Sequence, residues 1–278
     1  MLALEPRVVD ALWAAVEPRI PVRAEPVHPL GCHRPRIPDR DVFEGVLFRL
    51  VTGCSWDVAG RLGKGSESTL RTRYNEWNAQ GVFDELAVEA IDGYDRIVGL
   101  DLSEVSVDGS VHKAPCGGDG TGKSPVDRGK LGWKWSLLCD RAGIPVSWAV
   151  DGANRNDCTL FEPTLEAAPR GLLADVETIH LDRGYSGNPV LAVCRNFGID
   201  DVVRTPKRPP GRVCKQPKTV PLGMRWTIER TNSWLSNFGQ LRRSTDRDTK
   251  ARLGQLALAI AAIITIKLIK WANRWNHY

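Results

Sequence analysis

Apolar residues recur at helical spacing through the first 80 residues, and glycines, serines or prolines separate the periodic stretches. The first stretch covers residues 8–16 and is followed by a proline-rich connector. Three further helices are predicted at residues 39–52, 56–62 and 69–80. Two short helices, a glycine turn and a third helix form a helix-turn-helix pattern.

The third of these helices carries Arg71 and Arg73, which its apolar stripe predicts to be exposed. Exposed arginines on such a helix are candidates for contacts with DNA phosphates and bases. The alternative is an ordinary three-helix bundle that binds no ligand. We expect a small all-α domain of helix-turn-helix type at residues 1–85, which recognises DNA.

From residue 103 the period of the pattern changes to two, which predicts strands. The predicted strands cover residues 103–108, 133–139, 144–150, 178–181 and 200–204, with helices at 159–167 and 188–196. Antiparallel strands followed by alternating helix and strand predict an α/β fold with a mixed sheet flanked by helices. Residues 86–102 are expected to connect it to the first domain.

Residues 225–243 form an amphipathic pattern that predicts one helix. Its apolar stripe contains Ile228, Leu235 and Phe238, while another face contains Arg225 and Glu229. The simplest interpretation is a surface ion pair between Arg225 and Glu229, which stabilises a helix by a few tenths of a kcal/mol. The second is that Glu229 binds a metal ion, provided that other acids meet it.

The last apolar run, residues 253–269, is interrupted or flanked by Gln255, Lys267 and Lys270. Its uninterrupted part is short for a bilayer span, so we expect a buried terminal helix and no membrane association.

The chain has 278 residues and a net charge of +5, but the charge is unevenly distributed. Residues 201–278 contain 16 basic and 4 acidic residues, which indicates a polyanionic partner such as nucleic acid. The seven cysteines form no CxxC pair, and the N-terminus lacks the pattern of a signal peptide. Both features predict a protein of the reducing cytoplasm.

Asp108 and Asp182 each end a predicted strand and precede a glycine. Acids at the ends of neighbouring strands converge where α/β sheets bind ligands, and the helix with Glu229 can pack across them. Three converging carboxylates require a cation, and oxygen ligands alone select Mg²⁺, with Mn²⁺ as a substitute. The alternative for each aspartate is a role in a turn.

Three sequence motifs resemble those of the DDE transposases of bacterial insertion sequences, specifically the insertion-sequence-five family. They are VDGS at Asp108, LDRGY at Asp182 and R-x-x-x-E-R-x-x-x-W-L at Glu229. The resemblance covers nearly the whole chain, because TGCSW, YNEW and GVFDEL are similar to that family's N-terminal DNA-binding region. Leu222 and Ser236 depart from the pattern, which has a tyrosine and a basic residue at these positions.

The resemblance implies a ribonuclease H-like catalytic domain, here residues 103–278 with a C-terminal helix. It also implies that Asp108, Asp182 and Glu229 bind two Mg²⁺ ions as a catalytic triad, and that Arg225 contacts DNA. We expect Arg230, Arg242 and Arg243 to hold the DNA backbone as well.

Two loops extend the predicted DNA-binding surface. Residues 204–218 carry six bases, among them Lys207, Arg208 and Arg212, and no acid. A solvated loop without a ligand is the alternative there. Residues 117–124 match the phosphate loop of NTPases, but proline and glycine follow where that loop requires a helix. We therefore predict a basic loop in which Lys113 contacts DNA, with a P-loop NTPase as the less favoured alternative.

The predicted function is metal-dependent cleavage of DNA at the terminal inverted repeats of an element, followed by strand transfer into target DNA. Joining two ends predicts a homodimer on DNA. The alternatives are a DNA-binding regulator or an inactive remnant with a non-catalytic core, and a nuclease that hydrolyses but never joins strands.

Overall fold

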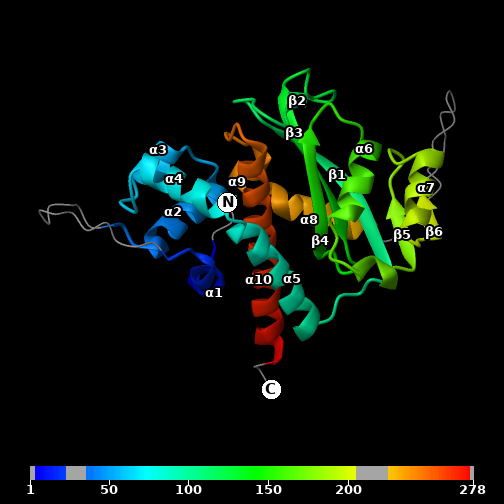
Figure 1. The fold of residues 1–278 in the computed structure, drawn as a ribbon, viewed down its shortest axis with the longest axis horizontal. Coiled ribbons are helices and arrows are strands. Elements are labelled where there is room, and N and C mark those ends of the chain that lie inside the picture. Colours follow the sequence, from blue (N-terminus) through cyan, green and yellow to red (C-terminus); the bar gives the residue numbers. More distant parts are fainter. Residues whose placement is uncertain (1–3, 23–35, 205–224, 276–278) are drawn as a thin grey trace, which may run out of the picture. The chain divides into compact units, whose positions relative to one another are not determined.

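The computed structural model describes residues 4–22, 36–204 and 225–275 (Figure 1). The chain divides into two compact units, each described below by itself. A helical unit contains Met1–Tyr94 and Leu235–Tyr278, and a sheet unit contains Asp95–Trp234.

Short helices of the N-terminal region make up most of the helical unit. They are α1 (Pro6–Val16), the 3-10 turn η1 (Glu17–Arg19), α2 (Asp39–Thr52), α3 (Trp56–Gly60), α4 (Glu67–Ala79) and α5 (Val82–Ile97). Ser55 and Ser66 start α3 and α4 as N-caps, each accepting a hydrogen bond from a backbone N–H three residues later. The helices predicted in this region are confirmed, but α5 occupies most of the segment predicted as a connector at residues 86–102.

Two C-terminal helices, α9 (Gly239–Arg242) and α10 (Thr249–Trp275), complete the helical unit. The predicted single helix at 225–243 is wrong, because α8 (Arg225–Ser236) ends before α9 begins. The cause is a close approach of two backbones. Gly53 ends α2 at a φ of 76°, and a Cβ on it would lie 2.8 Å from the carbonyl carbon of Gly239.

The long helix α10 packs against α1 and α4 of the helical unit. Tyr74 of α4 donates a hydrogen bond of 2.5 Å to the carbonyl oxygen of Ala251. Arg49 of α2, which is buried, pairs with Asp246 at 2.9 Å just before α10 and lies 4.1 Å from the Trp56 ring. The C-terminal helix, which the sequence analysis placed in the catalytic domain at 103–278, packs within the helical unit, where its apolar face completes the core.

Helix α10 is long and apolar enough to cross a membrane by length and composition, and it is the one such helix in the described part of the chain. Most residues from Ala251 to Ile264 are buried inside the structure. The prediction of a buried helix is confirmed for that part.

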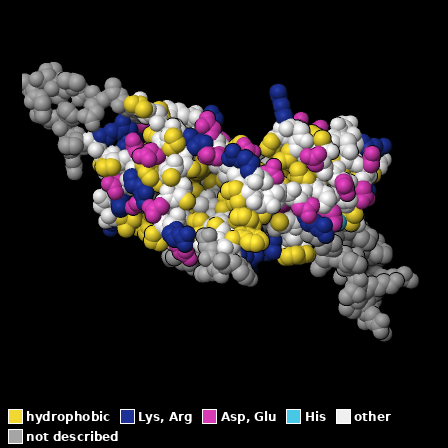
Figure 2. All heavy atoms as spheres, turned by 90° about the horizontal axis from the view of Figure 1, so that it is seen from below, with side chains coloured by type: hydrophobic (Ala, Val, Ile, Leu, Met, Phe, Trp, Pro, Cys, Tyr) yellow, Lys and Arg dark blue, Asp and Glu magenta, His cyan; other side chains and the backbone are white. Residues whose placement is uncertain are grey.

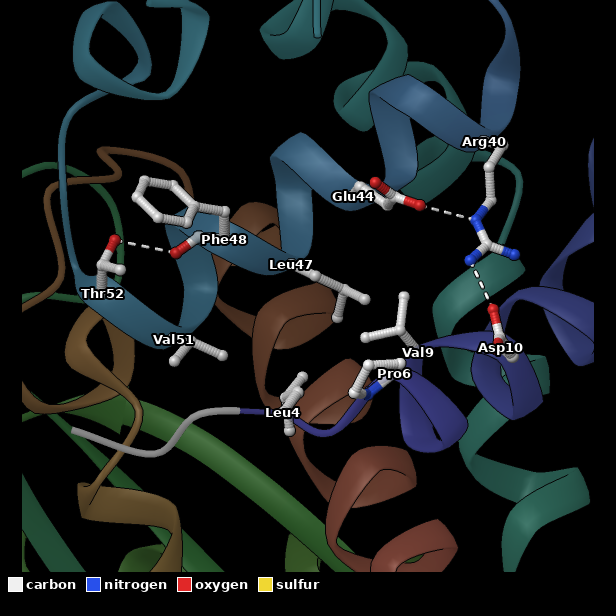
Figure 3. Close-up of a pocket in the computed structure, with 10 residues that line it drawn as sticks. All are labelled: Leu4, Pro6, Val9, Asp10, Arg40, Glu44, Leu47, Phe48, Val51 and Thr52. Atoms are coloured by element: carbon white, nitrogen blue, oxygen red, sulfur yellow. Dashed lines mark hydrogen bonds and ion pairs between the residues drawn. The ribbon is translucent and has the colours of Figure 1, made fainter. Parts of the chain in front are cut away.

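A pocket of about 490 Å³ lies in the helical unit, lined by α2 and the start of the chain through α1 (Figure 3). Its wall is mostly apolar, with Leu47 of α2 pointing toward Val9 of α1. Arg40 links Glu44 to Asp10 at one side of it, at 2.8 and 2.6 Å. None of the predicted site residues that the structure describes lines this pocket.

The sheet unit contains one mixed sheet, and its strands lie close to the predicted positions. They are β1 (Glu104–Lys113), β2 (Gly122–Lys123), β3 (Leu131–Cys139), β4 (Pro145–Gly152), β5 (Thr178–Leu181) and β6 (Asp201–Arg204). The spatial order is β4-β3-β1-β5-β6, with the short β2 also on β3. Strands β1, β3 and β4 pair antiparallel, while β5 and β6 run parallel to β1. This is the predicted ribonuclease H-like arrangement.

The remaining helices of this unit are α6 (Asp157–Glu166), the 3-10 turn η2 (Leu172–Asp175), α7 (Asn188–Asn196) and most of α8. Contacts place α6 and α8 on opposite faces of the sheet. Trp135 and Lys134 are consecutive residues of β3, so they point to opposite faces. Trp135 bonds to Asn232 of α8, and Lys134 to Asp157 of α6.

Two expectations about this unit are corrected. Strand β1 does not end at Asp108, because Gly109 and Ser110 continue the ladder opposite Ser136 and Trp135. The P-loop alternative is wrong, since Gly122 and Lys123 form β2 and a turn-rich loop follows where a phosphate loop requires a helix.

Candidate active site

Asp108 and Asp182 lie side by side because of the register of two parallel strands. Val107 of β1 is paired with Leu181 of β5, so the next residue on each strand is one of the two aspartates. The predicted convergence therefore comes from this pairing, although Asp108 lies within its strand and Asp182 directly after its own.

The Asp108 carboxyl is largely buried on the α8 side of the sheet. Burial raises its pKa from 3.8 to about 6, and the negative charges of Asp182 and Asp157 act in the same direction, while Arg225 opposes them. The amide of Asn232 donates a hydrogen bond of 3.0 Å to Asp108 Oδ2. Asp108 thus has neighbouring charges of both signs and one fixed hydrogen bond from α8.

Glu229 is linked to Asp182 through Arg225. The Nη2 atom of Arg225 lies 3.2 Å from Glu229 Oε1 and 3.5 Å from Asp182 Oδ2. The other oxygen of Asp182 accepts a hydrogen bond from the backbone N–H of Gly184. The Glu229 side chain is 52% exposed, whereas that of Arg225 is 15% exposed. The bridge holds the first turn of α8 at the end of β5.

Asp157 is a fourth acid of the site and is not among the candidates named from the sequence. Its Oδ1 accepts a hydrogen bond of 2.8 Å from Lys134, whose side chain is 7% exposed. A Cβ added to Gly109 would lie 2.6 Å from this Oδ1, and one added to Gly184 would lie 3.2 Å from Oδ2. Asp157 therefore packs against the backbone that follows both predicted catalytic aspartates.

Signals for these missed residues exist in the sequence. Lys134 is the one charged residue in the strand segment WKWSLL, which indicates a buried partner. Asn232 follows Glu229 by three residues and so shares its helix face. Asp157 is in the first turn of α6, directly after the N-cap Asn156. The N-terminus of a helix favours a negative charge, which is the local reason for an acid at this position.

The possible metal ligands of the site are all carboxylate oxygens, which are the ligand type that hard divalent cations prefer. In the ranges that the structure describes, no three acids, histidines or cysteines lie close enough together to form a complete metal site. Arg225 bridges Asp182 and Glu229 instead. The residues fit an ion at Asp108 and Asp182, with Glu229 held nearby by Arg225.

The predicted DNA contacts differ in their exposure. Lys113, Arg71, Arg242 and Arg243 are exposed, and Arg71 lies 3.6 Å from Glu67. Among the coloured residues of Figure 2, basic and acidic side chains are interspersed on the face shown. Lys207, Arg208 and Arg212 lie outside the described residues.

Besides Arg225, two of the predicted contacts are engaged within the protein. Arg73 is buried, not exposed: it donates to the Ile37 carbonyl and pairs with Asp39, each at 2.8 Å. The expectation of an exposed Arg73 is therefore wrong. Arg230 lies over the rings of Trp226 and Trp234, 4.6 and 4.7 Å from their centroids, and donates to the carbonyl oxygen of Ala142.

Comparison with known proteins assigns the chain to a family. Residues 99–264 match the family model described as "Transposase DDE domain", which is more than half of the chain. The chain belongs to the DDE transposase family. Residues 8–87 of this DDE transposase match the model described as "Putative transposase of IS4/5 family". The resemblance seen in the sequence motifs is confirmed, and membership implies dependence on a divalent metal ion.

Two relatives come from Burkholderia cepacia. The "Putative transposase for insertion sequence element IS402" is 33% identical over 128 residues, which cover 44% of this chain and 57% of the relative. The "Insertion element IS402 uncharacterized 16.2 kDa protein" is 33% identical over 125 residues, which cover 44% of this chain and 82% of the relative. The chain therefore spans little more than half the length of the first relative.

Solved transposase structures resemble the chain weakly. A piggyBac transposase synaptic complex with hairpin DNA has a TM-score of 0.41 at 12% identity, over 95% of this chain and 73% of that one. A pre-cleavage Mos1 transpososome has a TM-score of 0.27 at 11% identity, over 88% of this chain and 81% of that one.

Proposed function

We propose that this chain is a transposase that cuts DNA at the ends of an insertion sequence and joins them to target DNA, using Mg²⁺ or, as a substitute, Mn²⁺. The observation that carries the proposal is the position of Asp108 and Asp182 on neighbouring parallel strands, with Glu229 linked to Asp182 through Arg225. Family membership supports the same reaction.

Each acid has a defined part in this proposal. Asp108 and Asp182 hold the metal ions, and Glu229 completes one site. When bound, two such ions activate the attacking oxygen and stabilise the leaving oxygen of a phosphodiester. Arg225 keeps Glu229 beside Asp182 and contacts a DNA phosphate.

Double-stranded DNA is the proposed partner, as terminal inverted repeats and as target. The 16 basic and 4 acidic residues at positions 201–278 support it, because phosphate contacts by Lys and Arg supply most of the affinity for DNA. Arg71, Lys113, Arg242 and Arg243 are exposed for such contacts. A homodimer on DNA follows from the need to join two ends, and we propose that the chain acts in the cytoplasm.

The test is cleavage of DNA that carries the element's flanking inverted repeats, with Mg²⁺ and then Mn²⁺. We expect the wild type to nick at the repeat ends, and Asp182→Ala to bind the same DNA without cutting it. Asp175→Asn, which changes an exposed acid of η2 in the same unit, is the matched control and retains cleavage. A wild type that binds these ends and never cuts with either ion contradicts the proposal.

A second candidate function is a DNA-binding regulator with a non-catalytic core. It is favoured by the position of Arg225, whose Nη2 lies 3.5 Å from Asp182 and 3.2 Å from Glu229, so that its charge pairs with both carboxylates. This candidate predicts DNA binding that is unchanged by Asp108→Ala and by removal of divalent metal, with no cleavage in any sample.

A further inference from the structure

Asn232 connects the core of the sheet to the first aspartate of the site. It lies on α8 and is 8% exposed. Its Oδ1 accepts a hydrogen bond of 2.8 Å from the indole Nε1 of Trp135, and its Nδ2 donates one of 3.0 Å to Asp108 Oδ2. The three side chains form a continuous path from β3 through α8 to β1.

The indole of Trp135 determines which way the amide of Asn232 points. An indole N–H only donates, so it requires the amide oxygen on its side. The NH₂ group is then directed at Asp108, where it meets a carboxylate that accepts. A tryptophan of the sheet core thereby fixes the orientation of the donor that contacts Asp108.

Two elements of this path, β3 and α8, are held in place. Trp135 is fully buried, and the ring of His112 stacks on it at 3.5 Å between centroids. Next to Asn232, the Thr231 hydroxyl donates to the carbonyl oxygen of Gly143, at 2.6 Å, in the turn between β3 and β4. Helix α8 therefore cannot shift along the sheet without breaking these contacts.

We propose that Asn232, oriented by Trp135, is a positioning residue that fixes the rotation of the Asp108 carboxylate for metal binding and DNA cleavage. The inference rests on the proposed function and adds two residues to it. The terminal torsion of an aspartate is otherwise broad. Hydrogen bonds to a ligating carboxylate restrict that torsion, and loss of such a partner costs about 10–100-fold in metal affinity or activity.

The first test replaces the amide. Asn232→Leu removes the donor at similar volume, and Asn232→Asp puts an acceptor opposite Asp108. We expect the cleavage rate at saturating DNA to fall by about 10–100-fold in both variants. We expect the Kd for DNA to stay unchanged and the Mn²⁺ concentration for half-maximal cleavage to rise. Binding of Mn²⁺ alone, followed by water-proton relaxation, weakens in parallel.

The second test isolates the role of the indole N–H with a matched pair of tryptophans. Trp133 and Trp135 are both buried in β3, but among the described residues the Trp133 indole nitrogen has no hydrogen-bond partner. Trp133→Phe and Trp135→Phe remove similar volumes from the same strand. We expect Trp135→Phe to raise the Mn²⁺ requirement about tenfold and Trp133→Phe to leave it within about twofold.

The outcomes separate this inference from the proposed function. A wild type that neither binds Mn²⁺ nor cuts overturns the function, and the positioning role with it. If the wild type cuts and Asn232→Leu cuts equally fast at the same Mn²⁺ concentration, only the positioning role fails. Equal losses in the two tryptophan variants overturn the role of Trp135. Thermal unfolding of each variant confirms that the measured chain is folded.

Discussion

The Oδ1 atom of Asp157 lies 2.6 Å from the position that a Cβ would take on Gly109. No side chain fits at residue 109 unless Asp157 moves. We expect Gly109→Ala to displace Asp157, shift the strand beside Asp108 and lower the rate of metal-dependent DNA cleavage at least tenfold. Overpacking of a filled site costs about 1–3 kcal/mol, so the free energy of unfolding should fall by that amount.

The control for this prediction is Gly93→Ala in α5. A Cβ at residue 93 meets no atom within 4 Å. Alanine is favoured over glycine within a helix by about 1 kcal/mol, so this variant should be slightly stabilised and fully active. Urea unfolding and cleavage rates of both variants check the pair. Normal cleavage by Gly109→Ala would contradict the close packing.

Lys134→Met is expected to destabilise the sheet unit. It leaves Asp157 without the ammonium group 2.8 Å away, and it removes the hydrogen bond from Lys134 to the carbonyl oxygen of Arg155. Removing one partner of a largely buried pair costs several kcal/mol, and since Asp157 is 35% exposed we expect about 1–3 kcal/mol. Urea unfolding measures it. Arg155→Met, which removes an exposed pair with Asp151, should change stability by less than about 1 kcal/mol.

Arg225→Gln is expected to change metal and DNA binding in opposite directions. It removes the cation that lies between Asp182 and Glu229, so the affinity for Mn²⁺ alone should rise several-fold. It also removes the proposed phosphate contact, so DNA binding should weaken and its dependence on log salt concentration should fall by about one unit. Mn²⁺ titration and DNA binding over a salt series check both. Unchanged Mn²⁺ affinity would show that Arg225 does not compete with the ion.

The stability of the chain should respond to pH through two buried groups of β1 with opposite signs. The pKa of Asp108 is raised from 3.8 to about 6 by burial, so the folded chain keeps a proton that the unfolded chain has lost. The contribution of Asp108 to the free energy of unfolding therefore decreases as the pH rises from 3.8 to about 6, by up to about 3 kcal/mol.

Burial lowers the pKa of His112 from 6.5 to about 3, so the unfolded chain binds a proton first. Stability that depends on His112 is present above pH 6.5 and is lost as pH falls toward 3. Urea unfolding between pH 4 and pH 8 should show that Asp108→Asn removes the first dependence and His112→Phe the second. Parallel curves for wild type and both variants would contradict these environments.

The hydrophobic pattern correctly predicted the elements whose ends are set by residues adjacent in the sequence. Strand β5 and helix α7 lie where the sequence places them, because the strand ends before the turn Asp182-Arg183-Gly184 and the helix begins after Gly187 and ends before Gly198. The convergence of Asp108 and Asp182 was also predictable. Each aspartate directly follows an apolar residue of a predicted strand, and the ends of neighbouring strands meet at one edge of a sheet.

The errors arise where a distant contact decides the outcome. Residues Asp108-Gly109-Ser110 read as a turn, but their pairing with β3 extends the strand. The apolar stripe of α8 continues through Phe238 and Leu241, yet the helix ends because Gly239 packs on the end of α2. Arg73 sits at an outward spacing on α4 but is buried by Ile37 and Asp39, more than 30 residues earlier.

The helical unit is assembled from both ends of the chain, Met1–Tyr94 and Leu235–Tyr278, while the sheet unit is one continuous segment. During translation the sheet can form as soon as residue 234 leaves the ribosome. The N-terminal helices lack α10, which supplies much of their core, until the last residues are made. Premature termination within α10 would therefore release a chain with a complete catalytic sheet and an open, aggregation-prone helical unit.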